Sequence, residues 1–275
     1  DAAVAAAAVQ AVVDPHMTGV GGDCFVLYAP AGRDPVALNG SGRAPAALRL
    51  DALGGVAALP DDSPHAVTIP GAVAAWEALT ERFGRLGLDR ALDAAIRCAR
   101  EGWRVHPRVG RDWRVAQARL ARGPGREHLL KDGEAPRIGD RIESPTLAST
   151  LERIAREGAR GFYQGPVARA MTARLAALGG LHKEDDFARA AAQWGAPISA
   201  PYRDRRLVEH PPNGQGLAAL IIARLLSRFD LADASLSEAD RAHLLAEATK
   251  AGYRMRDAIV ADPDVAPVDV EGALS

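Results

Sequence analysis

Residues 39–45 read Asn-Gly-Ser-Gly-Arg-Ala-Pro, a polar loop in which two glycines flank a serine and an arginine follows. A second glycine-rich stretch, Gly-Val-Gly-Gly-Asp, occupies residues 19–23, and a third, Pro-Pro-Asn-Gly-Gln-Gly, occupies residues 211–216. Short apolar runs at 25–29 and 36–39 separate the first two loops and indicate a β-hairpin. Because these loops carry little side-chain bulk, their backbone amides can approach a small ligand closely.

Charge and composition exclude several classes of partner. The 275 residues include 34 Lys and Arg against 35 Asp and Glu, a formal net charge of -1. A nearly neutral chain creates no field that would attract nucleic acid or an anionic membrane surface, so we expect neither as a partner. The two cysteines, Cys24 and Cys98, lack the spacing of a disulfide framework or a zinc site, and no metal is expected.

Hydrophobic periodicity predicts a chain rich in helices. The first helix, over residues 1–13, is rich in Ala and Val without a polar face, and we expect it to be buried on all sides. A strand is expected at 207–209, and a last long helix begins after Ser237 with Leu244, Ala248, Ala251, Met255 and Ile259 on one stripe. Further helices are expected at 71–83, 89–101, 145–157, 166–178 and 217–225.

No familiar catalytic motif occurs in the chain. There is no Gly-x-Ser-x-Gly elbow, no His-Glu-x-x-His and no P-loop, and residues 19–22 lack the third spaced glycine of a dinucleotide fingerprint. His16, His65 and His210 each lie beside a proline, and we interpret them as structural or exposed histidines. The residues alone therefore offer no nucleophile paired with a base.

Taken in order along the chain, these segments resemble the large subunit of the γ-glutamyltransferase family, whose members are N-terminal-nucleophile hydrolases. Further matching segments are Asp-Pro-His-Met-Thr-Gly at 14–19, Ile-Pro-Gly-Ala-Val at 69–73, Gly-Phe-Tyr at 161–163, residues 257–264 and residues 270–275. The resemblance implies an α+β fold, the four-layer αββα sandwich of the Ntn hydrolases, to which this chain supplies the helix-rich large-subunit part. Residues 1–275 would form a single large-subunit domain, which we expect to be incomplete at both ends.

The resemblance also explains the missing nucleophile. Family precursors cut themselves before a threonine, which becomes the N-terminus of a small subunit and uses its own α-amine as the base. No catalytic residue is then expected on this chain, and its partner would be the small subunit of the same precursor, with a dimer of such heterodimers as a further option. No cofactor is implied. The compartment stays open, with the cytoplasm favoured over the periplasm.

One position departs from the pattern of the γ-glutamyl-processing enzymes. Their motif Asp-Phe-Arg-Glu-Thr-Ala-Pro contains an arginine that holds the substrate α-carboxylate; with Ala44-Pro45 aligned, that position is Ser41, and the arginine is Arg43. Arg43 still offers a guanidinium to a carboxylate. Its displacement favours relatives that hydrolyse other amides, such as the oxamate amidohydrolases and cephalosporin acylases. The expected substrate-binding residues are Arg43, Ser41, Asn39, Gly21, Gly22, Asn213 and Gly214.

Three functions remain open at this point. The first is a self-processed amidohydrolase acting on a small, oxamate-like amide that bears a carboxylate. The second is a true γ-glutamyltransferase or glutathione hydrolase, and the third is a non-catalytic family member that binds a small acid. Arg43 has the alternative role of a salt-bridged turn residue, and Gly21, Gly22, Asn213 and Gly214 have that of plain turn residues.

Overall fold

The structure is a computed structural model that describes residues 1–60 and 62–275. The chain divides into two compact units. Unit 1 comprises residues 1–24 and 40–192, and unit 2 comprises residues 25–39 and 193–275. Helices and strands occur together, which confirms the predicted α+β class. The single domain expected over residues 1–275 stays a prediction.

Unit 1 is mainly helical. Its α-helices are α1 (Ala2–Val13), α2 (Ala72–Phe83), α3 (Gly87–Glu101), α4 (Pro107–Arg122), α5 (Arg126–Leu129), α6 (Pro145–Glu157), α7 (Arg160–Tyr163), α8 (Pro166–Ala177) and α9 (Glu184–Ala188). The 3₁₀ helices η1 (Leu50–Leu53) and η2 (Pro64–Ala66) and the paired strands β3 (Trp103–Arg104) and β4 (Arg141–Ile142) complete its elements. The helices predicted at 71–83, 89–101, 145–157 and 166–178 are confirmed as α2, α3, α6 and α8.

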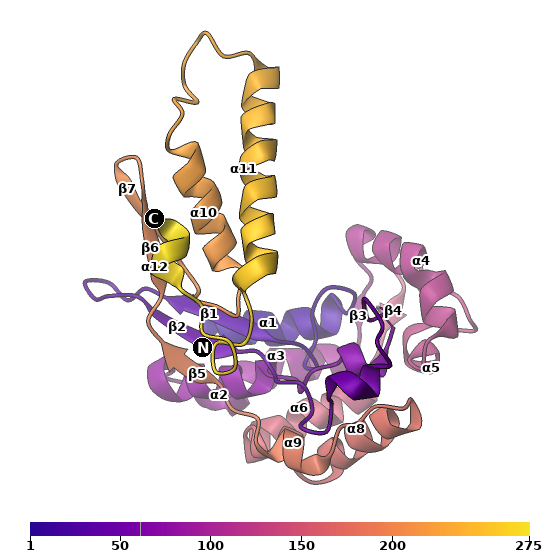
Figure 1. Ribbon diagram of the computed structural model, residues 1–275. Helices are drawn as coiled ribbons and strands as arrows, with labels where there is room; N and C mark the ends of the chain where they lie inside the picture. Colours follow the sequence, from indigo (N-terminus) through magenta and orange to yellow (C-terminus); the bar gives the residue numbers. More distant parts are fainter. Residues whose placement is uncertain (61) are drawn as a thin grey trace. The chain divides into compact units, whose positions relative to one another are not determined.

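The core of unit 1 is built around α3, which packs against α1 on one side and α6 on the other (Figure 1). Ala91, Ala95 and Ala99 are fully or almost fully buried on α3, and these small side chains let the neighbouring helices approach closely. Leu151 and Ile154 of α6 are fully buried in the same apolar cluster. Burial of this apolar surface is the main stabilising term for the unit.

Helix α1 is not buried on all sides, so that prediction is wrong. Its buried residues are Val4, Ala8, Ala11 and Val12, which follow the spacing of a single helical face. The alanines on the opposite face are exposed, as is Gln10. An alanine gains little from burial, so a run of alanines is compatible with either environment and does not specify the number of covered faces.

Unit 2 contains the remaining strands and helices. They are β1 (Cys24–Tyr28), β2 (Val36–Gly40), β5 (Gln193–Gly195), β6 (Ile198–Tyr202), β7 (Arg205–Glu209), α10 (Gly216–Leu226), α11 (Glu238–Ile259) and α12 (Val270–Leu274). Strands β1, β2 and β5 form one sheet in that order, with Leu38 opposite Trp194, and β6 pairs antiparallel with β7. The adjacent strands predicted at 25–29 and 36–39 and the strand at 207–209 are confirmed.

Helices α10 and α11 lie side by side (Figure 1). Their contact differs from the predicted stripe, because the buried residues of α11 are Ala248 and Gly252, while Met255 is 40% exposed. A Cβ on Gly252 would lie 2.5 Å from Ile222 Cγ1. The glycine therefore allows α10 to approach, and the contact face passes through residue 252 rather than through residues 251 and 255. No helix among the described residues has both the length and the apolar character needed to cross a membrane.

Three segments of unit 1 meet backbone to backbone: the glycine loop (residues 19–23), the Arg43 loop (residues 40–46) and the crossing segment (residues 67–72). A Cβ on Gly42 would lie 1.3 Å from the Ile69 carbonyl oxygen, and one on Gly71 would lie 2.1 Å from the Gly40 carbonyl oxygen. Only glycine fits at such approaches. Gly21 differs, because a Cβ built on it meets no atom within 4 Å.

A buried carboxylate anchors the far end of the Arg43 loop. Asp186, whose side chain is 6% exposed, accepts hydrogen bonds from Lys183 N at 3.0 Å and Ala46 N at 3.2 Å, and it pairs with Arg189 at 2.8 Å. Burial raises the pKa of Asp186, but the two backbone hydrogen bonds and the Arg189 charge outweigh this, so its pKa lies below the usual aspartate value. Asp186 thus joins the start of α9 to the Arg43 loop.

We expect Gly42→Ala to destabilise the full-length protein by at least about 3 kcal/mol, because the new methyl group would overlap a backbone carbonyl that cannot rotate away. Gly21→Ala is the matched control, since it has open space and should change stability by less than about 0.5 kcal/mol. Denaturant unfolding measures both variants. Similar losses at the two positions would contradict the close approach at Gly42.

We expect Asp186→Asn to cost about 1–3 kcal/mol at neutral pH, because one of the two backbone donors then faces an amide nitrogen. A carboxyl group with a lowered folded pKa stabilises the fold above its unfolded pKa, and that contribution is lost as pH falls through the folded value. The difference between wild type and variant should therefore disappear in strong acid. Unfolding curves at pH 7 and below pH 3 measure it.

Asp240→Asn is the control for this variant. Asp240 accepts from Ser237 N at 3.0 Å at the start of α11, which is the same capping role in unit 2. Only Asp186→Asn should also speed amide hydrogen exchange in residues 43–46. Unchanged exchange there would show that Asp186 caps α9 without anchoring the loop.

Candidate functional site

Arg43 lies on a loop whose backbone is fixed while its side chain is exposed. The Arg43 carbonyl oxygen accepts from Ile69 N at 2.9 Å, and Gly42 N donates to Asp23 Oδ1 at 3.1 Å. Together with Ala46 N on Asp186, three backbone groups in five residues are held by other segments of unit 1. A guanidinium at the surface is thereby presented from a rigid base, and a guanidinium can make paired hydrogen bonds to a carboxylate.

The glycine loop contacts the Arg43 loop and the start of α2. The Gly22 carbonyl oxygen accepts from Gly71 N at 3.0 Å and from Ala72 N at 2.9 Å, so it satisfies amides at the helix N-terminus. Gly21 and Gly22 are both exposed. Of the predicted site residues, unit 1 therefore brings Gly21, Gly22, Ser41 and Arg43 into one cluster, joined by the hydrogen bond between Asp23 and Gly42.

The other predicted site residues, Asn39, Asn213 and Gly214, lie in unit 2. Asn39 Nδ2 donates to Asn213 Oδ1 at 2.7 Å, which joins the end of β2 to the loop before α10. The peptide bond between Pro212 and Asn213 is cis. The structure brings the two asparagines into direct contact. A Cβ built on neighbouring Gly214 would lie 3.4 Å from His210 Nδ1, which is an ordinary contact distance.

His210 has a structural role, as the sequence predicted for it. It is 7% exposed, with Nε2 at 3.1 Å from the Leu38 carbonyl oxygen and Nδ1 at 2.9 Å from the Pro211 carbonyl oxygen. The Phe25 ring packs edge-on against it with centroids 5.0 Å apart. The imidazole therefore reinforces the junction that the asparagine pair makes between β2 and the loop.

A cavity of about 460 Å³ lies in unit 1 beside the glycine loop, lined on its polar side by Gln10, His16, Thr18, Gly22 and Asp23. Ser41 and Arg43 are not among its lining residues in the described part of the chain. Cys24 also lines it, and burial, with a smaller contribution from Asp23, raises the pKa of the thiol. A protonated thiol is a poor nucleophile, so Cys24 does not supply the missing one.

Sequence reasoning missed the residues that brace the site. Asp23 and His182 contact residues that are distant in the sequence. The Asp23 carboxylate accepts a hydrogen bond from Gly42 N, and His182 Nε2 lies 2.8 Å from the Val67 carbonyl oxygen of the crossing segment. Nothing in their spacing signals these contacts. Asp186 could have been found from the sequence. It lies three positions after Lys183, the residue that precedes α9, and an acidic residue at this spacing is typical of a helix cap. The described residues contain no group of three or more His, Cys, Asp or Glu suited to a metal ion.

Comparison with known proteins identifies the family. The sequence model of the Gamma-glutamyltranspeptidase family matches residues 1–275. The chain is 37% identical over 282 residues to the oxamate amidohydrolase proenzyme of Klebsiella pneumoniae, covering all of this chain and 53% of that protein. It is 35% identical over 277 residues to the glutathione hydrolase-like YwrD proenzyme of Bacillus subtilis, again covering 53% of the relative. The chain thus spans about half the length of these curated relatives.

Solved structures lead to the same family. The cephalosporin acylase of Bacillus halodurans aligns with a TM-score of 0.91 and 34% identity, over 99% of this chain and 52% of that one. The gamma-glutamyltranspeptidase of Helicobacter pylori aligns with a TM-score of 0.91 and 28% identity, over 99% of this chain and 80% of that one. The resemblance inferred from the motifs is confirmed, and the chain belongs to the gamma-glutamyltranspeptidase family.

Proposed function

We propose that this chain is the substrate-binding subunit of a self-processed amidohydrolase that acts on a small amide bearing a carboxylate, with oxamate as the simplest example. The observation that carries the proposal is the exposed Arg43 side chain on a loop whose backbone is fixed at Gly42, Arg43 and Ala46. The similarity of the chain to an oxamate amidohydrolase proenzyme supports this substrate class.

The binding chemistry follows from the residues of the loops. A guanidinium offers paired N–H donors that match the two oxygens of a carboxylate. Because the Arg43 loop is already ordered, little conformational entropy is lost when the substrate binds. Gly21 supports the same role, since its exposed backbone has open space above it that a small substrate could enter. We propose that Ser41, Asn39, Asn213, Gly22 and Gly214 also contribute to substrate binding.

The bond-breaking step would use a nucleophile outside this chain. Because the relatives are proenzymes of about twice this length, we expect that nucleophile to be the N-terminal threonine of a small subunit cut from the same precursor. Its hydroxyl would attack the amide carbon, its proton would pass through the α-amine to the leaving nitrogen, and an ester would form. Water would then cleave the ester, so that oxamate gives oxalate and ammonia.

A glutathione hydrolase is the second candidate. The relative named glutathione hydrolase-like supports it, and so does Asp23, an exposed acidic residue beside the Arg43 loop that could accept a bond from the α-ammonium of a γ-glutamyl group. Turnover of oxamate, a γ-glutamyl anilide and a glutaryl amide by the full-length processed protein separates the candidates. Preference for the anilide would favour the second, and the absence of an N-terminal threonine on the partner chain would favour a non-catalytic binder.

We expect Arg43→Ala to lower kcat/KM for oxamate by about 30-fold or more, because removing a charge-assisted contact to a carboxylate that is desolvated in the bound complex costs about 2–5 kcal/mol. Arg43→Lys should recover only part of the loss, because an ammonium cannot make the paired contact. The matched control is Arg49→Ala, since the Arg49 side chain is 80% exposed in the same region of the sequence. Equal losses on oxamate and on its uncharged analogue oxamide would refute the carboxylate contact.

A further inference from the structure

We infer that His16 is a positioning residue, which holds the glycine loop and, through it, the Arg43 loop in the conformation that binds substrate. All the groups involved belong to unit 1. The inference rests on the proposed function, since it assigns a purpose to the rigidity of the Arg43 loop. His16 lies outside that loop, and its polar contacts are with Asp14 and Asp112, which are not predicted site residues.

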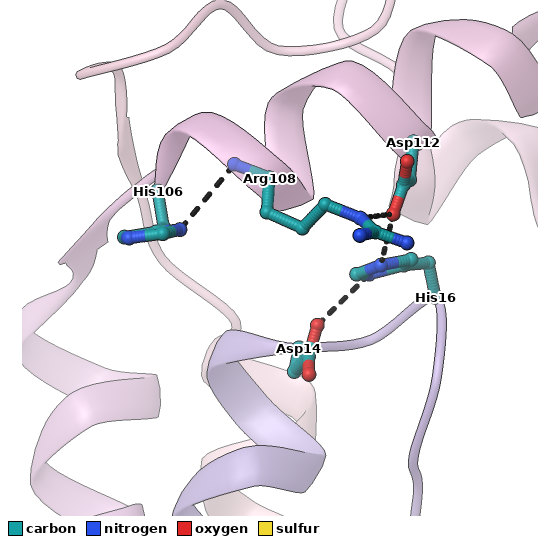
Figure 2. Close-up of polar contacts among 5 residues, drawn as sticks. All are labelled: Asp14, His16, His106, Arg108 and Asp112. Carbon is teal, nitrogen blue, oxygen red and sulfur yellow. Dashed lines mark hydrogen bonds and ion pairs between the residues drawn. The ribbon is translucent and has the colours of Figure 1, made fainter. Parts of the chain in front are cut away.

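Figure 2 shows the imidazole of His16 between two carboxylates. Its Nε2 lies 3.2 Å from Asp112 Oδ2 on α4, and its Nδ1 lies 3.0 Å from Asp14 Oδ1 at the end of α1. The side chain is only 14% exposed. Arg108 Nε donates to the same Asp112 oxygen, so His16 joins an existing ion pair on α4.

The hydrogen bond to Asp112 has a defined direction. Arg108, through its hydrogen bond and its charge, holds the pKa of Asp112 below the usual aspartate value, and His16 adds to this effect. Asp112 is therefore a carboxylate at neutral pH, and a carboxylate oxygen can only accept. The imidazole Nε2 must accordingly carry a hydrogen in this contact, and His16 donates from the segment before the glycine loop to a fixed acceptor on α4.

This contact is transmitted to the substrate loops through the backbone. The Asp14 carbonyl oxygen accepts from Met17 N at 3.0 Å and Thr18 N at 3.1 Å, which forms a tight turn that carries His16. Four residues later the Gly22 carbonyl accepts from the start of α2, and Asp23 holds Gly42.

Two side chains of the turn point away from the core. Met17 is 70% exposed and Thr18 is also exposed, so neither side chain fastens the turn to the core. His16 is the largely buried polar side chain of this stretch, and it also lines the cavity beside the glycine loop. Without its contact to α4, the turn would move more freely, and the carboxylate of Asp23 would be held less firmly over the Gly42 amide.

Two conservative substitutions distinguish the contact made by Nε2 of His16 from that made by Nδ1. The amide nitrogen of glutamine can reach the position of the imidazole Nε2, whereas that of asparagine reaches only the position of Nδ1. His16→Gln should therefore keep the contact to Asp112, and His16→Asn should lose it. Asp112→Ala removes the acceptor from the other side and should reproduce the effect of His16→Asn without changing the turn itself.

The experiment uses the full-length processed protein with oxamate as the probe. We expect His16→Asn and Asp112→Ala to raise KM roughly tenfold or more with a much smaller change in kcat, because a displaced binding group weakens positioning before it affects the chemical step. Hydrogen exchange at Gly42 and Gly71 should become faster in both variants. His16→Gln should remain near wild type. The control pair is His128→Gln and His128→Asn, because that side chain is 69% exposed on α5.

Equal KM values for His16→Gln and His16→Asn would overturn the inference. So would a lower melting temperature with unchanged KM and unchanged exchange at Gly42, because that result describes a purely structural histidine. If the wild-type protein turns over no carboxylate amide, the proposed function fails. The exchange rates of Gly42 and Gly71 in the two His16 variants then still decide whether His16 positions the loops.

Discussion

The hydrogen bonds of Gly22 and Asp23 are the constraint on which the candidate site depends. The Gly22 carbonyl accepts hydrogen bonds from the first amides of α2. The Asp23 carboxylate accepts one from the amide of Gly42. The Arg43 loop and the crossing segment also lie in direct backbone contact, which the glycines at 42 and 71 permit. The glycine loop, the Arg43 loop and the crossing segment therefore form one rigid assembly within unit 1.

Rigidity of this kind is what recognition of a small ligand needs. Asp23, Ile69 and Asp186 bind backbone groups of the Arg43 loop, and the Arg43 side chain stays exposed. Under the proposed function, the guanidinium on this ordered loop would bind a carboxylate with little entropic cost. Unit 2 contains its own junction, in which Asn39 and His210 tie the end of β2 to the loop before α10. In each unit the predicted site residues lie beside polar groups that organise a loop.

Much of the fold could be predicted from the sequence. Helices with glycine or proline at their ends, such as α2, α6 and α8, were confirmed, because capping and apolar periodicity are local properties. The predictions that were wrong concerned burial: α1 is covered on one face, and the contact face of α11 passes through Gly252. Burial depends on which neighbour approaches, and alanine and glycine carry little information about that.

The sequence by itself determined the family and the positions of most helices, because motif order and caps are readable along the chain; its carboxylate-binding residues stay a prediction. Only the tertiary structure decided what holds Arg43 in place. The contacts of Asp23 with Gly42 and of Asp186 with Ala46 join residues 19 and 140 positions apart, and that of His16 with Asp112 spans 96. Such pairs follow no local periodicity; they exist because the packing of unit 1 brings their segments together.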